Sequence, residues 1–168
     1  MSLQTRLVLI AALALPALAA RAELKSGDPF PSLAAAGLDG TLPATEGKVV
    51  LVDFWASWCA PCKASFPSYL RLQEEYAPRG LVIVAVSVDE NQAAYEKFVK
   101  NHHPPFATVR DRTQQLVSQV NVPTMPTCYL VGHDGTVRFV HQGFHGEDSE
   151  RELRKEIATL LAENAHPS

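Results

Sequence analysis

The chain has 168 residues and a formal net charge of −3, with 46% hydrophobic and 20% charged residues. This size and composition are typical of one soluble globular domain that builds its own hydrophobic core. The negative charge argues against a nucleic-acid-binding protein, because such proteins present a basic face. The three cysteines are too few for a disulfide framework of the kind that holds small secreted domains together.

Residues 1–22 have the pattern of a secretory signal peptide. A short positive start, MSLQTR, precedes the apolar run LVLIAALALPAL and an A-x-A arrangement that ends at Ala22, although a second A-x-A ends at Ala19. The apolar run is shorter than the roughly 20 residues that span a membrane, and an uncleaved anchor is the alternative reading. We therefore expect a domain over residues 23–168 that works in a periplasm, where disulfides form and persist.

The first half of this domain predicts a strand–helix–strand unit. Residues 23–48 carry turn signals and are expected to form a loop or weak hairpin on the sheet edge. The runs VVLVDFW (49–55) and LVIVAVSV (81–88) are continuous and rich in β-branched residues, as in parallel strands buried on both faces. A helix over about 61–76 joins them.

The second half continues the alternation. The pattern predicts helices at 91–102 and 112–120, a strand at 106–109, and a hairpin of strands at 127–131 and 136–141. Apolar residues then recur at helical spacing from Leu153 to Leu161, and Ser149 with Glu152 is expected to form a capping box before that helix. One α/β domain is the predicted fold class.

Two of the cysteines, Cys59 and Cys62, lie between the first strand and the first helix in DFWASWCAPCKASFP. Proline is tolerated in the first turn of a helix, so Pro61 places Cys59 at the helix N-terminus. Unpaired N–H groups and the helix dipole stabilise a thiolate there. Cys62 follows on the same face, close enough to close a disulfide. We expect an exposed, acidic Cys59 that attacks and a buried Cys62 that resolves.

Other uses of the pair have less support. A structural zinc site needs four ligands, and only Cys128 and His133 remain as candidates. A purely structural disulfide across one helical turn closes a small loop and constrains little. Neither Cys59 nor Cys62 has the P-x-x-x-[ST]-x-x-C pattern of a peroxidatic cysteine. The histidines show no ligand spacing on one element, so we expect neither a metal nor a cofactor.

The segment GKVVLVDFWASWCAPC, with the preceding GDPFP and LDG, resembles the TlpA/ResA-like extracytoplasmic thiol-disulfide oxidoreductases of the thioredoxin superfamily. The resemblance covers nearly all of residues 25–162. It implies a thioredoxin-like fold, with a central mixed sheet flanked by helices. Residues 90–110 resemble the extra helix and strand that separate this branch from small thioredoxins.

The resemblance also implies a substrate-binding surface around the cysteines. The family's cis-proline matches Pro126 in MPT, and an extended substrate would pair with the backbone of Met125 beside it. Pro123, which also precedes a threonine, is the alternative from sequence alone. The other residues expected at this surface are Thr127, Trp58, Ala60, Pro61 and Gly143.

Asp53 interrupts an apolar strand, so we expect it to be buried beneath the cysteines with a raised pKa, where it would take the proton from Cys62. The alternative is a solvent-facing side chain at a strand end. Relatives often carry a glutamate three residues after the second cysteine, whereas this chain has Ser65. Cys128 is expected to be a buried free thiol.

These features predict a monomeric periplasmic protein-disulfide reductase with no nucleic-acid partner. The resemblance implies disulfide-bearing substrate proteins, among them those of cytochrome c or respiratory oxidase assembly, and a membrane electron donor of the DsbD/CcdA kind. Ala60-Pro61 is close to the Gly-Pro of thioredoxin and favours a reductant. A net oxidant is the alternative within the class. A copper-binding metallochaperone is the alternative from another class, although the chain has only two methionines to serve as ligands.

Overall fold

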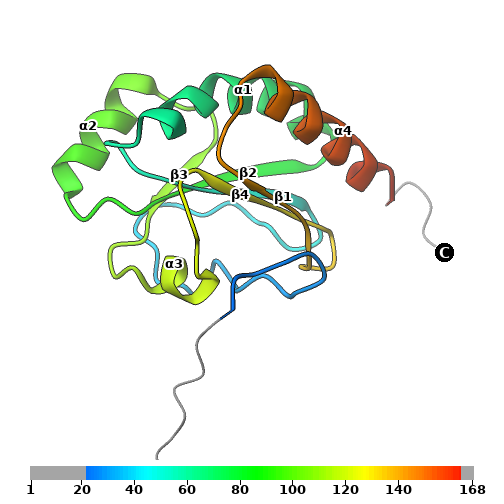
Figure 1. Ribbon diagram of the computed structural model, residues 1–168, viewed down its shortest axis with the longest axis horizontal. Coiled ribbons are helices and arrows are strands. Elements are labelled where there is room, and N and C mark those ends of the chain that lie inside the picture. The colour runs from blue at the N-terminus through cyan, green and yellow to red at the C-terminus, as the bar shows by residue number, and fades with distance from the viewer. Residues whose placement is uncertain (1–21, 164–168) are drawn as a thin grey trace, which may run out of the picture.

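The computed structural model describes residues 22–163, which form a five-stranded sheet flanked by helices (Figure 1). The strands lie in the order β3-β2-β1-β4-β5. β1, β2 and β3 are parallel, whereas β4 pairs antiparallel with both β1 and β5. The predicted central mixed sheet is confirmed. The strands span Val49–Trp55 (β1), Leu81–Ser87 (β2), Ala107–Arg110 (β3), Thr127–Val131 (β4) and Val137–Gln142 (β5).

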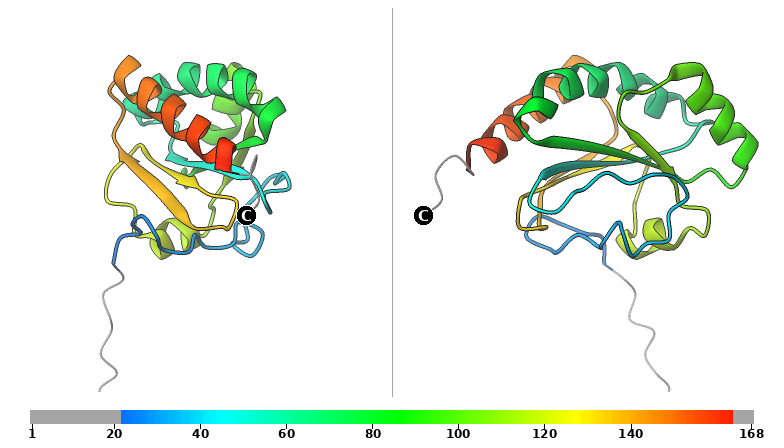
Figure 2. Two further views of the ribbon diagram at one scale, coloured as in Figure 1. Left: turned by 90° about the vertical axis from the view of Figure 1, so that its right-hand side faces the viewer. Right: turned by 180° about the vertical axis from the view of Figure 1, so that it is seen from behind.

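The helices are unequally divided between the two faces of the sheet (Figures 1 and 2). α1, α2 and α4 lie on one face, and α3 lies on the other. They span Ala60–Tyr76 (α1), Gln92–His102 (α2), Gln115–Val120 (α3) and Glu147–Glu163 (α4), and a short 3-10 turn, Ala77–Arg79, follows α1.

β1 occupies the centre of the sheet because it is apolar on both faces. Every residue from Val49 to Trp55 is buried, as expected for a strand covered on both sides. The chain leaves the carboxyl end of β1 and enters α1 through the segment that carries Cys59 and Cys62.

The extra helix and strand expected near residues 90–110 are present as α2 and β3. The aromatic side chains of α2 attach it to the core. The rings of Phe98 and Trp55 are 4.6 Å apart, and the rings of Phe98 and Phe66 are 5.2 Å apart. These contacts join α2 to β1 and α1.

Contrary to our expectation, the N-terminal segment does not stay at one edge of the sheet. It crosses the face opposite α1 and α4 (Figure 2). It bridges to Thr136 through Pro29 on one side and to Arg110 through Asp39 on the other. Its apolar side chains explain this path, because Phe30 packs on Tyr129 of β4 with ring centroids 5.6 Å apart and thereby covers the sheet.

The predicted capping box is wrong. α4 begins at Glu147, so Ser149 lies inside its first turn, and its hydroxyl accepts a hydrogen bond of 2.9 Å from the His145 N–H. Three acidic residues stand in that first turn, where the positive end of the helix dipole favours them.

The helix expected from residue 112 begins later, at Gln115. The Asp111 carboxylate accepts hydrogen bonds from the backbone N–H groups of Gln115 and Val117, at 3.0 and 2.8 Å, and so fixes the start of α3. The predicted signal peptide falls almost wholly outside the described residues. Within residues 22–163, no helix is long and apolar enough to cross a membrane.

Candidate active site

The two cysteines of the CxxC motif form a disulfide at the N-terminus of α1. Cys59 is the N-cap residue, with extended backbone angles, and the Cys62 N–H donates to Cys59 Sγ at 3.3 Å. The predicted placement of Cys59 at the helix N-terminus is confirmed. A thiolate formed at this sulfur would face a backbone N–H donor and the positive end of the helix dipole.

The expected exposure of Cys59 is wrong for the oxidised protein. Cys59 is 6% exposed and Cys62 is fully buried. The Cys59 sulfur is bonded to Cys62, and the Cys59 N–H donates to the Ala56 carbonyl at 3.1 Å. Cys59 is still the more accessible of the two.

A buried carboxylate that the sequence analysis missed holds the turn before Cys59. Asp89 follows the carboxyl end of β2 and is 1% exposed. Its two oxygens accept hydrogen bonds from the N–H and the hydroxyl of Ser57, both at 2.8 Å. The only sequence signal was an acidic residue directly after a buried strand, which gives no indication of its partner.

The surface expected to bind substrate surrounds this turn. Trp58 is 68% exposed, and Ala60 and Pro61 beside it are exposed as well. The peptide bond between Met125 and Pro126 is cis, which confirms Pro126 rather than Pro123. Met125 is half-buried, whereas Pro126 is buried.

Gly143 and Thr127 hold the loop around Pro126. The Gly143 N–H donates to the Pro126 carbonyl at 2.7 Å, and Gly143 has a φ of +80°, a conformation that favours glycine. Thr127 is fully buried, and its hydroxyl donates to the Thr124 carbonyl at 2.8 Å. The Thr127 side chain therefore supports the loop from within.

Asp53 is fully buried in the middle of β1, which excludes the solvent-facing alternative. Its Oδ1 accepts a hydrogen bond of 2.8 Å from the Tyr69 hydroxyl, and its Oδ2 has no hydrogen-bond partner among the described residues. Burial raises the pKa of Asp53 from 3.8 to about 8, and the bond from Tyr69 lowers it in part. The predicted direction of this pKa shift agrees with the structure.

Cys128 is a buried free thiol, as expected. It lies directly opposite Asp53 in the β1–β4 pairing. Burial raises the pKa of this thiol, and the nearby Asp53 charge raises it further. A thiol in this environment stays protonated and unreactive.

One face of α1 connects the cysteines to Asp53. Cys62, Ser65 and Tyr69 recur at helical spacing and are buried on that face. The Ser65 hydroxyl donates to the Cys62 carbonyl at 2.7 Å. Tyr69 was not among the residues expected at this site, although its position seven residues after Cys62 indicates that both side chains face the sheet.

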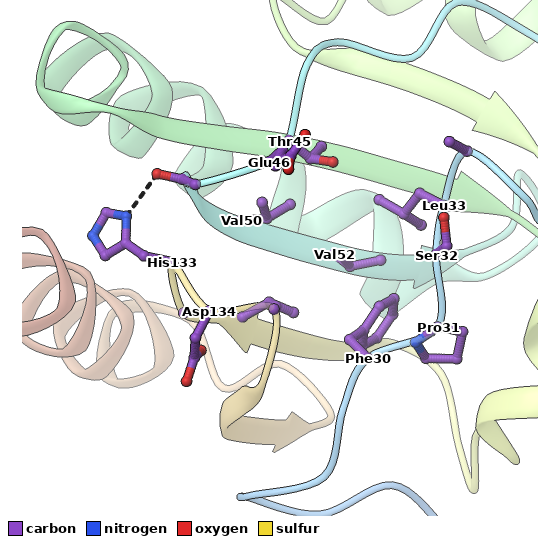
Figure 3. Close-up of a pocket in the computed structure, with 15 residues that line it drawn as sticks. Phe30, Pro31, Ser32, Leu33, Thr45, Glu46, Val50, Val52, His133 and Asp134 are labelled. Carbon is purple, nitrogen blue, oxygen red and sulfur yellow. Dashed lines mark hydrogen bonds between the residues drawn. The ribbon is translucent and has the colours of Figure 1, made fainter.

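A pocket of about 350 Å³ lies away from the cysteines, beneath the amino end of β1 (Figure 3). Its floor includes Val50 and Val52, and the N-terminal segment forms one wall. At its edge, a ring nitrogen of His133 lies 2.9 Å from the Gly47 carbonyl (Figure 3). The pocket and the CxxC motif are at opposite ends of β1. Among the described residues, no group of three or more His, Cys, Asp or Glu side chains could hold a metal ion.

The profile of the Redoxin family matches residues 25–157. The chain belongs to the Redoxin family. Its curated relatives include thiol-disulfide oxidoreductases ResA. The Geobacillus kaustophilus protein is 35% identical over 118 residues, which are 70% of this chain and 68% of that protein. The Bacillus thuringiensis protein is 29% identical over 141 residues, 82% of this chain and 80% of that protein.

Another ResA, from Oceanobacillus iheyensis, is 35% identical over 98 residues, and the match spans only about half of its length, 51%. Among solved structures, a thiol:disulfide interchange protein DsbE from Chlorobium tepidum is 32% identical with a TM-score of 0.76. That match covers 83% of this chain and 99% of the Chlorobium chain. This Redoxin-family protein is therefore a thiol-disulfide oxidoreductase of the ResA/DsbE kind, with Cys59 and Cys62 as its CxxC pair.

Proposed function

We propose that the protein is a periplasmic protein-disulfide reductase in which Cys59 is the nucleophile and Cys62 the resolving thiol. The observation that carries the proposal is the position of Cys59 as the N-cap of α1, with the Cys62 N–H pointing at its sulfur. Only the first cysteine of the pair is placed where the helix terminus stabilises a thiolate.

The reaction then proceeds in two exchanges. The Cys59 thiolate attacks one sulfur of the substrate disulfide, which forms a mixed disulfide and releases the other substrate sulfur as a thiolate. The Cys62 thiolate attacks Cys59 Sγ, which forms the Cys59–Cys62 disulfide and releases the second substrate sulfur. The substrate gains two electrons and the protein loses two.

Asp53 supplies the base for the second exchange in this proposal. A thiol must lose its proton before it attacks, and Cys62 is fully buried away from solvent. The Asp53 carboxyl is buried in the adjacent strand, with a pKa of about 8 and one oxygen free of hydrogen bonds among the described residues. A base with a pKa near the working pH is well matched to accept and return a proton.

The substrate would dock on the exposed surface around the disulfide. Trp58 offers a large exposed ring beside Cys59, and Ala60 and Pro61 extend this surface. An extended substrate segment would pair with the backbone at Met125, in the loop that Pro126, Thr127 and Gly143 support.

The class of protein and the N-terminal sequence support the partners and the compartment that we propose. The N-terminal sequence of residues 1–22 favours export, and a membrane donor of the DsbD/CcdA kind would re-reduce the pair there. Substrates in cytochrome c or respiratory oxidase assembly fit a ResA/DsbE-like oxidoreductase that acts as a monomer.

A measurement of the reduction potential tests the direction of electron flow. We expect equilibration with defined glutathione mixtures to place the pair near the roughly −270 mV of thioredoxin, because Ala60-Pro61 is close to the thioredoxin dipeptide. A value near the roughly −120 mV of DsbA would instead make the protein a net oxidant.

Trapping identifies the partners. In the Cys62→Ser variant no resolving thiol remains, so the mixed disulfide on Cys59 should accumulate and its substrate can be identified by mass spectrometry. The Cys59→Ser variant is the control and should capture fewer partners. Copper bound in place of protein adducts would favour the metallochaperone alternative and contradict the proposal.

A further inference from the structure

We propose that Tyr69 is a positioning residue for the exchange reaction: its hydroxyl anchors Oδ1 of Asp53 and leaves Oδ2 as the atom that receives the proton of Cys62. This inference rests on the role of Asp53 given above. It goes further in naming the group that controls when Asp53 can act as a base.

The geometry around Asp53 separates its two oxygens. The Tyr69 hydroxyl lies 2.8 Å from Oδ1, and both side chains are nearly or completely buried. Oδ2 is buried too, yet it has no hydrogen-bond partner within residues 22–163. A buried carboxylate oxygen without a partner is energetically costly, so this atom gains most from taking up a proton.

The other groups near Asp53 do not replace Tyr69. Cys128 lies opposite Asp53 on β4, and its thiol is protonated. The charge of Glu156 on α4 raises the pKa of the Cys128 thiol. Cys62 is in the disulfide and carries no charge in this state. Burial raises the pKa of Asp53, and the bond from Tyr69 lowers it.

A hydroxyl that donates to Oδ1 stabilises the carboxylate over the carboxylic acid. Tyr69 thus keeps part of the Asp53 population deprotonated at neutral pH, although burial favours the acid. During resolution the proton passes from Cys62 Sγ to Asp53 Oδ2, and the Cys62 thiolate attacks Cys59. When a donor later reduces the disulfide, Asp53 returns this proton to Cys62, so the proton balance closes over one cycle.

Tyr69→Phe tests this assignment, with Tyr129→Phe as the matched control. Tyr129 is also fully buried, but its hydroxyl has no hydrogen-bond partner among the described residues. We expect the Asp53 carboxyl, followed by carbon-13 NMR in the oxidised protein, to titrate at higher pH in Tyr69→Phe and at the wild-type pH in Tyr129→Phe. At pH 7 the mixed disulfide with glutathione should resolve about tenfold more slowly in Tyr69→Phe, and the difference should close at alkaline pH.

An unchanged Asp53 titration in a folded Tyr69→Phe variant would overturn the assignment. If that variant does not fold, the wild-type protein provides the test, because the Tyr69 Cζ resonance should titrate with the same midpoint as the Asp53 carboxyl. Different titration midpoints for Tyr69 and Asp53 would also overturn the assignment. Failure of the underlying function is distinct: resolution in Asp53→Asn would then keep the wild-type pH dependence, whatever Tyr69 does.

Discussion

Asp89 accepts two hydrogen bonds of 2.8 Å from Ser57, one from its N–H and one from its hydroxyl, and so ties the end of β2 to the turn that carries Cys59. The Ser87 hydroxyl donates a third bond of 2.8 Å to Asp89 Oδ2. A carboxylate buried with several donors is costly to remove, because the donors stay behind without partners. The turn that carries Cys59 is therefore held in place by a residue that follows another strand.

Asp89→Ala should lower the free energy of unfolding of the oxidised protein by about 3 kcal/mol, because the buried Ser87 hydroxyl and two partly buried donors of Ser57 lose their acceptor. Ser57→Ala, which keeps the backbone bond, should cost only about 1 kcal/mol. Urea unfolding measures both, with the exposed Glu74→Ala as the control. If Asp89→Ala and Ser57→Ala lose the same free energy of unfolding, the hydrogen bond from the Ser57 N–H to Asp89 does not stabilise the turn, and the prediction is contradicted.

Asp53→Asn should stabilise the oxidised protein, and more so at high pH. The folded state holds the Asp53 proton more tightly than the unfolded chain does, because burial raises its pKa from 3.8 to about 8. The contribution of Asp53 to the stability of the wild-type protein is therefore most favourable below pH 4. It declines as the pH rises to about 8 and stays low above that. Asp53→Asn has no carboxyl group to titrate at this position, so its stability does not fall in this way.

We expect the stability gain of Asp53→Asn to be roughly 3–6 kcal/mol larger at pH 9 than at pH 3. Urea unfolding at the two pH values measures the difference. Glu46→Gln, on the exposed N-terminal segment, controls for general charge effects. A gain that does not change with pH would mean that Asp53 has the same pKa in the folded and unfolded states.

The three thiols should differ in reactivity. In the reduced protein, iodoacetamide should modify Cys59 faster than Cys62 below pH 8, because only Cys59 caps the helix N-terminus. Cys128 should react only after unfolding, because burial raises the pKa of its thiol and blocks access. Peptide mapping after timed quenching resolves the sites. Faster modification of Cys62 would reverse the two catalytic roles.

Gly143→Ala should destabilise the protein by about 1 kcal/mol through its backbone alone. Its φ of +80° disfavours any side chain, yet a Cβ at this position would meet its nearest atom, Nε2 of His145, at an ordinary 3.6 Å. The loss should appear in thermal unfolding. Gly143→Asn, which tolerates this conformation better, should recover part of it. A much larger loss would point to a clash instead.

Glu150→Gln should weaken the contact between α1 and α4. Glu150 accepts hydrogen bonds from Ser68 at 2.8 Å and from Arg71 and Arg154 at 3.0 and 2.9 Å, and Arg71 lowers its pKa. Because the folded pKa is depressed, this stabilisation exists above the unfolded pKa and is lost as the pH falls through the folded one. We expect a loss of about 1 kcal/mol at pH 7 and a smaller loss at pH 3, measured by urea unfolding.

The sequence determined the features that depend on neighbouring residues. A continuous apolar run made β1 a buried central strand, and Pro61 directly after Cys59 started a helix there, so the place of the CxxC motif followed from local rules. Asp53 could be expected to be buried because its neighbours along the strand are apolar. These patterns involve residues that are close together along the chain, so they can be recognised in a single sequence.

Tertiary structure alone decided which buried polar groups meet. Tyr69 and Asp53 are 16 residues apart, and Ser57 and Asp89 are 32 apart. The first pairing depends on how α1 lies on the sheet, and the second depends on the register of β1 with β2. Polar side chains find partners through direction and distance, which hydrophobic periodicity does not encode. The low exposure of Cys59 and the path of the N-terminal segment across the sheet likewise depend on packing between distant parts of the chain.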